Sequence, residues 1–190
     1  MKRLDTNFWS NYFKIYDVLN LAHPYRELMN LVIDMIPKIN NQNILDAGSG
    51  TGNLSTKLSI LGGKVHSLDN SKEGLEIHLS KDRMANIYLH DLSKPLPFED
   101  NFFDSIISLN TICFINKEDR ERIFFEFYRV LKDDGKIIVV NLLDGFRPYK
   151  IFLSHIRFSI KDNGILISLK DIVSLFIPAL KIFYYSIIHI

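Results

Sequence analysis

Three glycines on alternate positions, Gly48, Gly50 and Gly52, are the residues of this sequence with the clearest chemical meaning. They follow an apolar run from Ile44 that predicts a buried strand, and a helical pattern resumes at Leu54. Glycine lets a backbone approach a ligand closely, and a helix N-terminus presents free N–H groups to an anion. The strand, turn and helix therefore predict a seat for a nucleotide-like ligand.

The spacing of these glycines discriminates between ligands. A dinucleotide fingerprint needs its third glycine three residues after the second, where this chain has Asn53. A P-loop needs Gly-Lys-Ser/Thr after four intervening residues, and none follows. Residues 44–52, with Asp46 two places before the first glycine, resemble the first motif of class I S-adenosylmethionine methyltransferases. A nicotinamide-dependent reductase and a glycine turn without a ligand are the less favoured alternatives.

Two further stretches carry the same resemblance. Residues 96–108, LPFEDNFFDSIIS, are similar to the segment that leads into and through the fourth strand of this superfamily, and residues 126–139, EFYRVLKDDGKIIV, to the helix, turn and strand that follow. The resemblance thus covers residues 43–143. It implies S-adenosylmethionine as the cofactor and an enzyme that transfers its methyl group.

Polar residues directly after the predicted strands are the candidate cofactor ligands, because ligands of an open parallel sheet sit beyond the carboxyl ends of its strands. The Asp69 carboxylate could accept two hydrogen bonds from ribose hydroxyls, although it could instead cap the helix that begins near Ser71. The resemblance gives Asp69 to the ribose, Asp91 and Leu92 to adenine, and Asn110 to the neighbourhood of the methyl group. The full set expected to bind the cofactor is Asp46, Ala47, Gly48, Ser49, Gly50, Gly52, Asp69, Asn70, Asp91, Leu92 and Asn110.

Methyl transfer from a sulfonium is an in-line displacement, so an enzyme mainly has to supply position and a dry pocket. A general base would help with a hydroxyl or carbon acceptor, and the weak candidates are Tyr12, Tyr16, His23 and His155. No metal site is expected, because the six histidines are scattered. Residues 110–113, Asn-Thr-Ile-Cys, stand where amide-nitrogen methyltransferases carry Asn-Pro-Pro-Tyr, which leaves small molecules and lipids as acceptors. The aromatic and apolar content of residues 1–25 and 144–170 favours a hydrophobic or amphipathic acceptor, such as a quinone precursor or a lipid headgroup.

The elements that must position these residues alternate along the chain. Strands are predicted at 43–46, 64–69, 86–90, 104–110 and 136–143, and helices at 54–61, 71–80 and 117–132. Two helices precede them, at 6–21 and from Pro24, the second with an apolar stripe of Leu28, Leu31, Val32, Met35 and Ile36. This pattern predicts an α/β fold, a Rossmann-like, doubly wound, mostly parallel sheet with helices on both faces.

We expect residues 1–190 to form a single domain. Residues 1–40 would be a helical lid, where Tyr16 and Asp17 resemble the Tyr-Asp segment of many small-molecule methyltransferases. Residues 43–143 would bind the cofactor, and 144–190 would supply a substrate-side helix at 147–160 and a last strand at 180–190. The family normally adds a seventh, antiparallel strand, for which no residues remain. A non-catalytic protein that binds S-adenosylmethionine is therefore a second hypothesis.

Composition and net charge indicate the broad class of protein and its expected partners. The 190 residues carry a net charge of +1 and one cysteine, Cys113. Without a basic tract, nucleic acid is not an expected partner, and a lone cysteine and the absence of a signal peptide fit the cytoplasm. The apolar segment 172–190 reads as a helix and a buried strand rather than a span, since Pro178 and Lys181 interrupt it. Peripheral membrane contact remains an open expectation, and no feature indicates an oligomeric state.

Overall fold

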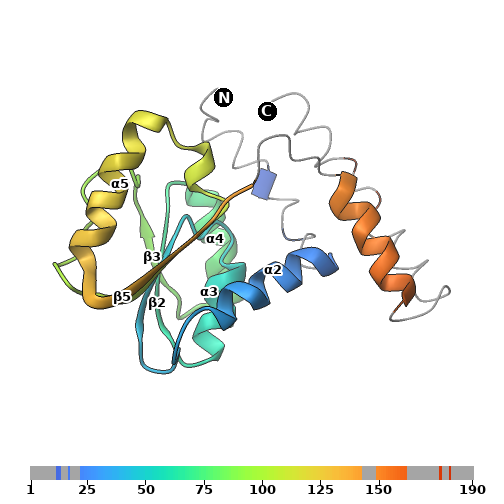
Figure 1. Cartoon of the computed structure of the whole chain (residues 1–190), viewed down its shortest axis with the longest axis horizontal. Helices are drawn as coiled ribbons and strands as arrows, with labels where there is room; N and C mark the ends of the chain where they lie inside the picture. The colour runs from blue at the N-terminus through green and yellow to red at the C-terminus, as the bar shows by residue number, and fades with distance from the viewer. Residues whose placement is uncertain are drawn as a thin grey trace.

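The computed structural model describes residues 12, 13, 17, 22–142, 149–161, 176 and 180. Their centre is a five-stranded, wholly parallel sheet in the order β3-β2-β1-β4-β5 (Figure 1). The strands are β1 (Asn43–Ala47), β2 (Lys64–Asp69), β3 (Asn86–Leu89), β4 (Phe103–Leu109) and β5 (Leu131–Val140). The predicted α/β class and the first four strands are thereby confirmed to within a residue or two.

The sheet order creates a switch point between β1 and β4. β1 continues through α3 (Asn53–Ile60) to β2 on one side, whereas β4 continues through the short η2 (Ile112–Phe114) and α5 (Lys117–Val130) to β5 on the other. The two neighbouring strands therefore send their following loops in opposite directions. A crevice at the carboxyl ends of such strands is the usual ligand site of open α/β sheets.

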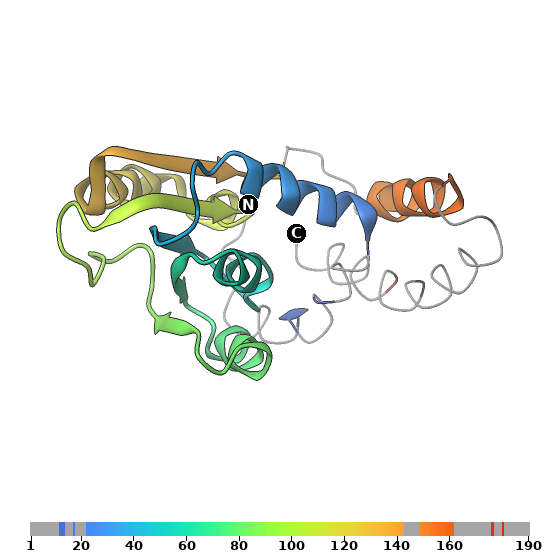
Figure 2. The same cartoon turned by 90° about the horizontal axis from the view of Figure 1, so that it is seen from below.

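Helices cover both faces of this sheet, as the sequence predicts. Figure 2 shows α5, in yellow, on one face and α2 (His23–Asp34), α3 and α4 (Lys72–Lys81) on the other. The core on the α5 side includes Ile123, Phe127 and Phe103, all at most 1% exposed. The core on the other side joins Val32 of α2 and Leu58 of α3 to the middle strands.

The predicted apolar stripe of the second helix, α2, is confirmed at Val32 and Ile36, which are buried, and wrong at Leu31 and Met35. Leu31 and Met35 are exposed, and the buried residues of the helix are Tyr25, Met29 and Val32. These three follow the four- and three-residue steps of one helix face. Apolar residues flank this face on both sides, so the periodicity of the sequence alone did not identify the side that meets the sheet.

β5 begins five residues earlier than predicted. Leu131 pairs with Phe103 and Lys136 pairs with Ser105, so five residues of β5 span two residues of β4. The Asp133-Asp134-Gly135 turn that the sequence predicts therefore lies within the strand as a bulge.

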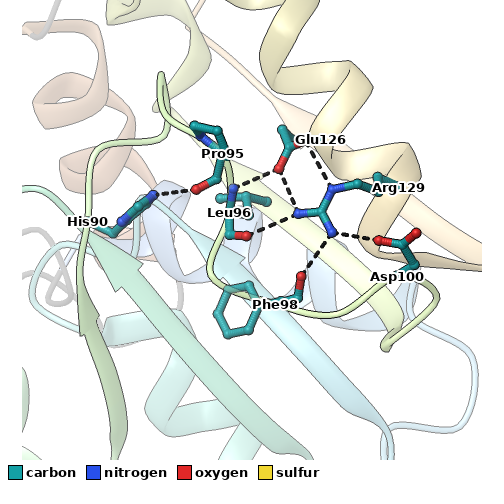
Figure 3. Close-up of polar contacts among 7 residues, drawn as sticks. All are labelled: His90, Pro95, Leu96, Phe98, Asp100, Glu126 and Arg129. Carbon is teal, nitrogen blue, oxygen red and sulfur yellow. Dashed lines mark hydrogen bonds and ion pairs between the residues drawn. The ribbon is translucent and has the colours of Figure 1, made fainter.

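The long connection from β3 to β4 is held by a side-chain network centred on Arg129 of α5 (Figure 3). Its guanidinium donates to the carbonyl oxygens of Leu96 and Phe98, at 3.0 and 2.9 Å, and to both carboxylate oxygens of Glu126, at 3.0 and 2.7 Å. Glu126 also accepts the Leu96 N–H at 2.7 Å, and the hydrogen bond from Arg129 lowers the pKa of the Glu126 carboxyl. The loop after β3 is thus fixed to α5 by charge-assisted bonds.

A helix over residues 149–161 packs beside the N-terminal end of α2, close to the predicted substrate-side helix. Of the predicted strand at 180–190 the structure describes only Leu180, which is helical, and most of the predicted helix at 6–21 lies outside the described residues. Within the described ranges, no helix combines the length and the apolar character that a membrane crossing requires.

Candidate functional site

The glycine turn closes against the ends of two neighbouring strands. The N–H groups of Gly48 and Ser49 both donate to the Leu68 carbonyl of β2, at 2.7 and 3.0 Å. Gly48 and Gly52 have φ angles of 87° and 75°, a region that side chains disfavour. A Cβ on Gly48 would lie 2.2 Å from Thr111 Oγ1, and one on Gly52 would lie 2.1 Å from a ring carbon of His78. Both positions therefore require glycine.

Asp69 connects this turn to the next helix. Its two carboxylate oxygens accept the N–H groups of Gly50 and Ser71, each at 2.8 Å. The residue is 8% exposed, and burial raises the pKa of its carboxyl against the lowering effect of those hydrogen bonds. The N-cap of α4 is Ser71, whose Oγ accepts the Gly74 N–H at 3.2 Å. The Asn70 N–H is a third donor to this carboxylate, so about one of its roughly four acceptor positions remains for a hydroxyl donor.

Asp46 is buried and lies one layer behind the turn. Ser55 of α3 donates its hydroxyl to Asp46 at 2.5 Å, and Ser67 of β2 donates to Ser55 at 2.8 Å. Burial raises the pKa of Asp46 to about 6, helped by the nearby charge of Asp69, although the hydrogen bonds from Ser55 oppose this. This chain of hydroxyls joins β1, α3 and β2 directly beneath the glycines.

The other predicted cofactor residues also lie at the carboxyl edge of the sheet. The His90 N–H donates to the Asp69 carbonyl at 2.9 Å, so the ends of β2 and β3 are adjacent, and Asp91 accepts the Ser93 N–H at 2.9 Å. Asn110 has a φ of 54°, and the next residue, Thr111, donates its hydroxyl to the Gly48 carbonyl at 3.3 Å. Three of the predicted residues support the site from within the protein. Ala47 and Leu92 are buried in the core, and the Asn70 N–H donates to the Asp69 carboxylate.

Two residues of the N-terminal segment contact the turn. A Cβ on Gly50 would lie 3.0 Å from the Phe13 ring, so this ring covers the middle glycine. Asp17 accepts the Thr51 hydroxyl at 2.6 Å and forms an ion pair of 2.7 Å with Lys81. Lys81 in turn donates to the Thr51 carbonyl at 2.8 Å. The segment expected to act as a lid thus reaches the predicted cofactor turn.

The structure describes the settings of two candidate general bases, Tyr12 and His155, in detail. Burial raises the pKa of the Tyr12 phenol, with a contribution from Tyr25, so it ionises less easily. His155 is 3% exposed, and its Nδ1 accepts the His23 N–H at 3.1 Å, which engages the lone pair that a base would use. Tyr16 lies outside the described residues. Among the residues that the structure describes, no three His, Cys, Asp or Glu side chains gather as they would around a metal ion.

Several supporting residues were not identified from the sequence. Ser55, Ser67 and Lys81 act across the turn through contacts 9 to 64 residues apart in the chain. The one local signal of this support in the sequence is Ser55, which lies in the first turn of the helix that follows the glycines. His78 packs against Gly52, and burial lowers the pKa of its ring; only the folded chain brings these two together.

Comparison with known proteins gives a consistent result. The model of a family described as a methyltransferase domain matches residues 45–139. The chain is 30% identical over 137 residues to the ubiquinone/menaquinone biosynthesis C-methyltransferase of Vibrio cholerae, an alignment that covers 66% of this chain and 52% of that protein. It is 34% identical over 116 residues to the malonyl-[acyl-carrier protein] O-methyltransferase of Buchnera aphidicola, covering 61% and 46%. The chain therefore spans about half the length of these curated relatives.

Among crystal structures, a Methanococcus maripaludis protein, itself proposed to be an S-adenosylmethionine-dependent methyltransferase, is similar over nearly the whole chain. The TM-score is 0.63 at 25% identity, and the match covers 95% of this chain and 87% of the other. The Rossmann-like methyltransferase fold is thereby confirmed.

The residues at the turn fit S-adenosylmethionine, the cofactor that this fold and family imply. That molecule carries a carboxylate, a ribose with two hydroxyls and a sulfonium. A glycine turn that runs into a helix N-terminus suits the carboxylate, and Asp69 suits the hydroxyls. The buried Oγ of Ser49 has no hydrogen-bond partner in the described part of the chain, so it is available to a ligand. The chemistry of the donors at the turn thus matches that of the ligand.

Proposed function

We propose that this chain, which belongs to the methyltransferase-domain family, transfers a methyl group from S-adenosylmethionine to a hydrophobic or amphipathic small molecule. One observation carries the proposal: an Asp69 carboxylate oxygen and the N–H nitrogen of Gly50 are 2.8 Å apart at the carboxyl ends of β2 and β1, next to the switch point of the sheet. This pair links the acid after β2 to the glycine turn after β1, where the carboxyl ends of the strands meet.

The chain's own residues would contribute mainly position. When bound, S-adenosylmethionine supplies an electrophilic methyl group on a sulfonium. Asp69 would hold the ribose, and the N–H groups of the turn, with Ser49, would hold the carboxylate. Phe13 over Gly50, and Asp17 joined to Lys81, would limit the access of water to that end of the site. A displacement with a good leaving group needs alignment more than it needs a base, which agrees with the settings of Tyr12 and His155.

Support for an apolar acceptor comes from the side chains beside the end of β4. A buried cluster of Ala22, Tyr25 and Met29 packs against Leu109, the last residue of β4, and against Ile151 of helix 149–161. This places apolar and aromatic side chains at the carboxyl end of β4, and such surroundings favour ligands that carry apolar groups. The relatives from Vibrio cholerae and Buchnera aphidicola are named for quinone biosynthesis and for an acyl-carrier protein substrate.

The proposal is tested by an acceptor panel. The purified full chain would be incubated with methyl-labelled S-adenosylmethionine and, in separate reactions, with unmethylated quinones, fatty acyl carriers, phenols, amino acids and nucleotides. We expect label in one of the first three classes, and at least a tenfold loss in Asp69→Asn, because a hydrogen bond to a charged group contributes about 1.5–3 kcal/mol.

Two outcomes would change the assignment. Turnover of the polar classes alone would contradict an apolar acceptor while keeping the methyltransferase activity. Binding of S-adenosylmethionine without transfer to any class would instead favour the second hypothesis, a non-catalytic protein that binds this cofactor.

A further inference from the structure

Helix 149–161 has an unusual distribution of polarity. The buried side chains of its inner face include two polar ones, His155 and Ser159, which are 3% and 4% exposed. By contrast, Tyr149, Leu153 and Ile160 are exposed by 42%, 56% and 42%. Burying polar side chains while leaving large apolar ones in water is the reverse of the usual arrangement, so the outer face needs an explanation of its own.

The exposed apolar side chains form one strip along the helix. At about 100° per residue, Tyr149, Leu153 and Ile160 fall within roughly 40° of one another around the axis. Beyond them on the same side, the half-buried Phe152 is 6.3 Å from the ring of Phe176, which is itself 49% exposed. The apolar surface therefore continues away from the helix in that direction.

A second, basic strip runs beside the first one. Lys150, Arg157 and Lys161 are exposed and also fall within roughly 40° of one another. No Asp or Glu occurs in residues 149–161, and none of the three cations has an ion pair or hydrogen bond within the part of the chain that the structure describes. The outer face is thus half apolar and half cationic, without a neutralising acid on its own helix.

The helix lies at one edge of the described part of the molecule (Figures 1 and 2). In both views the helix, in orange, lies at the opposite end of the molecule from α5, beyond the N-terminal end of α2 (Figures 1 and 2). It is anchored from the inside: the His23 N–H donates to His155, and the rings of His23 and Phe158 stack with centroids 4.5 Å apart. The anchoring uses the inner face, and the residues of both outer strips are exposed.

From this arrangement we infer that helix 149–161 docks on the surface of an anionic phospholipid bilayer. An interfacial helix buries an apolar strip at the level of the lipid headgroups, and adjacent lysines and arginines meet the phosphates. Charge complementarity favours this occupant over a second copy of the chain, since two such faces would bring like charges together. The inference does not depend on methyl transfer, although it would bring an acceptor from the membrane close to the cluster beside β4.

Vesicle co-sedimentation of the full chain tests the inference. We expect it to sediment with vesicles of phosphatidylcholine containing 30% phosphatidylglycerol, to bind pure phosphatidylcholine at least tenfold more weakly, and to be released by 0.5 M salt. Lys150→Gln/Lys161→Gln should weaken binding to the anionic vesicles about tenfold or more. Leu153→Ser/Ile160→Ser should reduce binding to both types of vesicle, because the apolar strip is lost.

Matched controls come from exposed residues of the same kinds elsewhere. Phe125→Ser/Tyr128→Ser removes two aromatic side chains of α5 that are each 69% exposed, and Arg83→Gln/Lys94→Gln removes two exposed cations. Both pairs should bind like the unmodified chain. The inference would be overturned if the folded chain failed to sediment with anionic vesicles, or if control and helix variants lost binding equally. It would also be overturned if the helix substitutions abolished self-association, measured by analytical ultracentrifugation, without affecting vesicle binding.

Discussion

Asp46 lies beneath the glycine turn, and its titration should be visible in the stability of the protein. Burial raises the pKa of this carboxyl from 3.8 to about 6. The folded state therefore binds more protons than the unfolded state between about pH 4 and 6, and stability falls as the pH rises through this window. A shift of this size corresponds to roughly 3 kcal/mol, all of it lost above the folded pKa.

We predict that Asp46→Asn removes this dependence. The amide oxygen can still accept the Ser55 hydroxyl, but it does not ionise. The difference in unfolding free energy between the two proteins, from urea titrations at pH 4 to 7.5, should grow with pH in favour of the variant and level off above pH 6–7. Asp104→Asn is the control of opposite sign. Burial acts to raise the pKa of Asp104, but hydrogen bonds from Lys132 and Asn43 prevail and lower it. A difference that stays constant with pH for Asp46→Asn would contradict the raised pKa.

At the scale of the secondary-structure elements, we predict that the hydrogen bonds of Arg129 stabilise the folded protein by holding the connection from β3 to β4. Arg129→Lys would keep the charge but lose the planar fork that reaches Leu96, Phe98 and Glu126 together. Glu126 would then be left buried with an incomplete partner, so we expect a loss of about 2–4 kcal/mol in unfolding free energy. Denaturant unfolding followed by circular dichroism measures it.

Arg122→Lys provides the comparison on the same helix. Arg122 forms one exposed ion pair with Asp119, and such pairs contribute at most about 1 kcal/mol. Similar losses in the two variants would show that the connection from β3 to β4 is not fixed by the Arg129 network.

Elements were predicted from the sequence to different degrees, and the reason is physical. β1 and β4 are buried on both faces and carry the apolar pairs Ile44-Leu45 and Ile106-Ile107 between turn residues, so they stand out locally. The buried face of α2 does not stand out in this way, because the sheet against which the helix packs determines which of its apolar residues become buried. The bulge in β5 likewise depends on pairing with β4, since Asp133–Gly135 has the composition of an ordinary turn.

For the whole molecule, the same distinction applies to the candidate site. The sequence predicted which residues follow each strand, and the parallel sheet brings Gly48, Asp69 and Asn110 to one edge. It did not predict the support behind them, such as Ser67 beneath Asp46, nor the contact of Phe13 with Gly50. These interactions join segments that only the completed fold brings together, so no local pattern of residue types predicts them.

The central claim, that the glycine turn and Asp69 bind S-adenosylmethionine, is tested most directly by calorimetric titration of the full chain. The titrants are S-adenosylmethionine, its demethylated product and NADH, on the unmodified protein and on Asp69→Asn and Asp104→Asn. We predict micromolar binding of the first two, none of NADH, and a loss of about 1–3 kcal/mol in Asp69→Asn alone, the scale for a hydrogen-bond partner of a charged group. A folded protein that binds NADH but not S-adenosylmethionine, or whose affinity for the latter is unchanged by Asp69→Asn, would contradict the account.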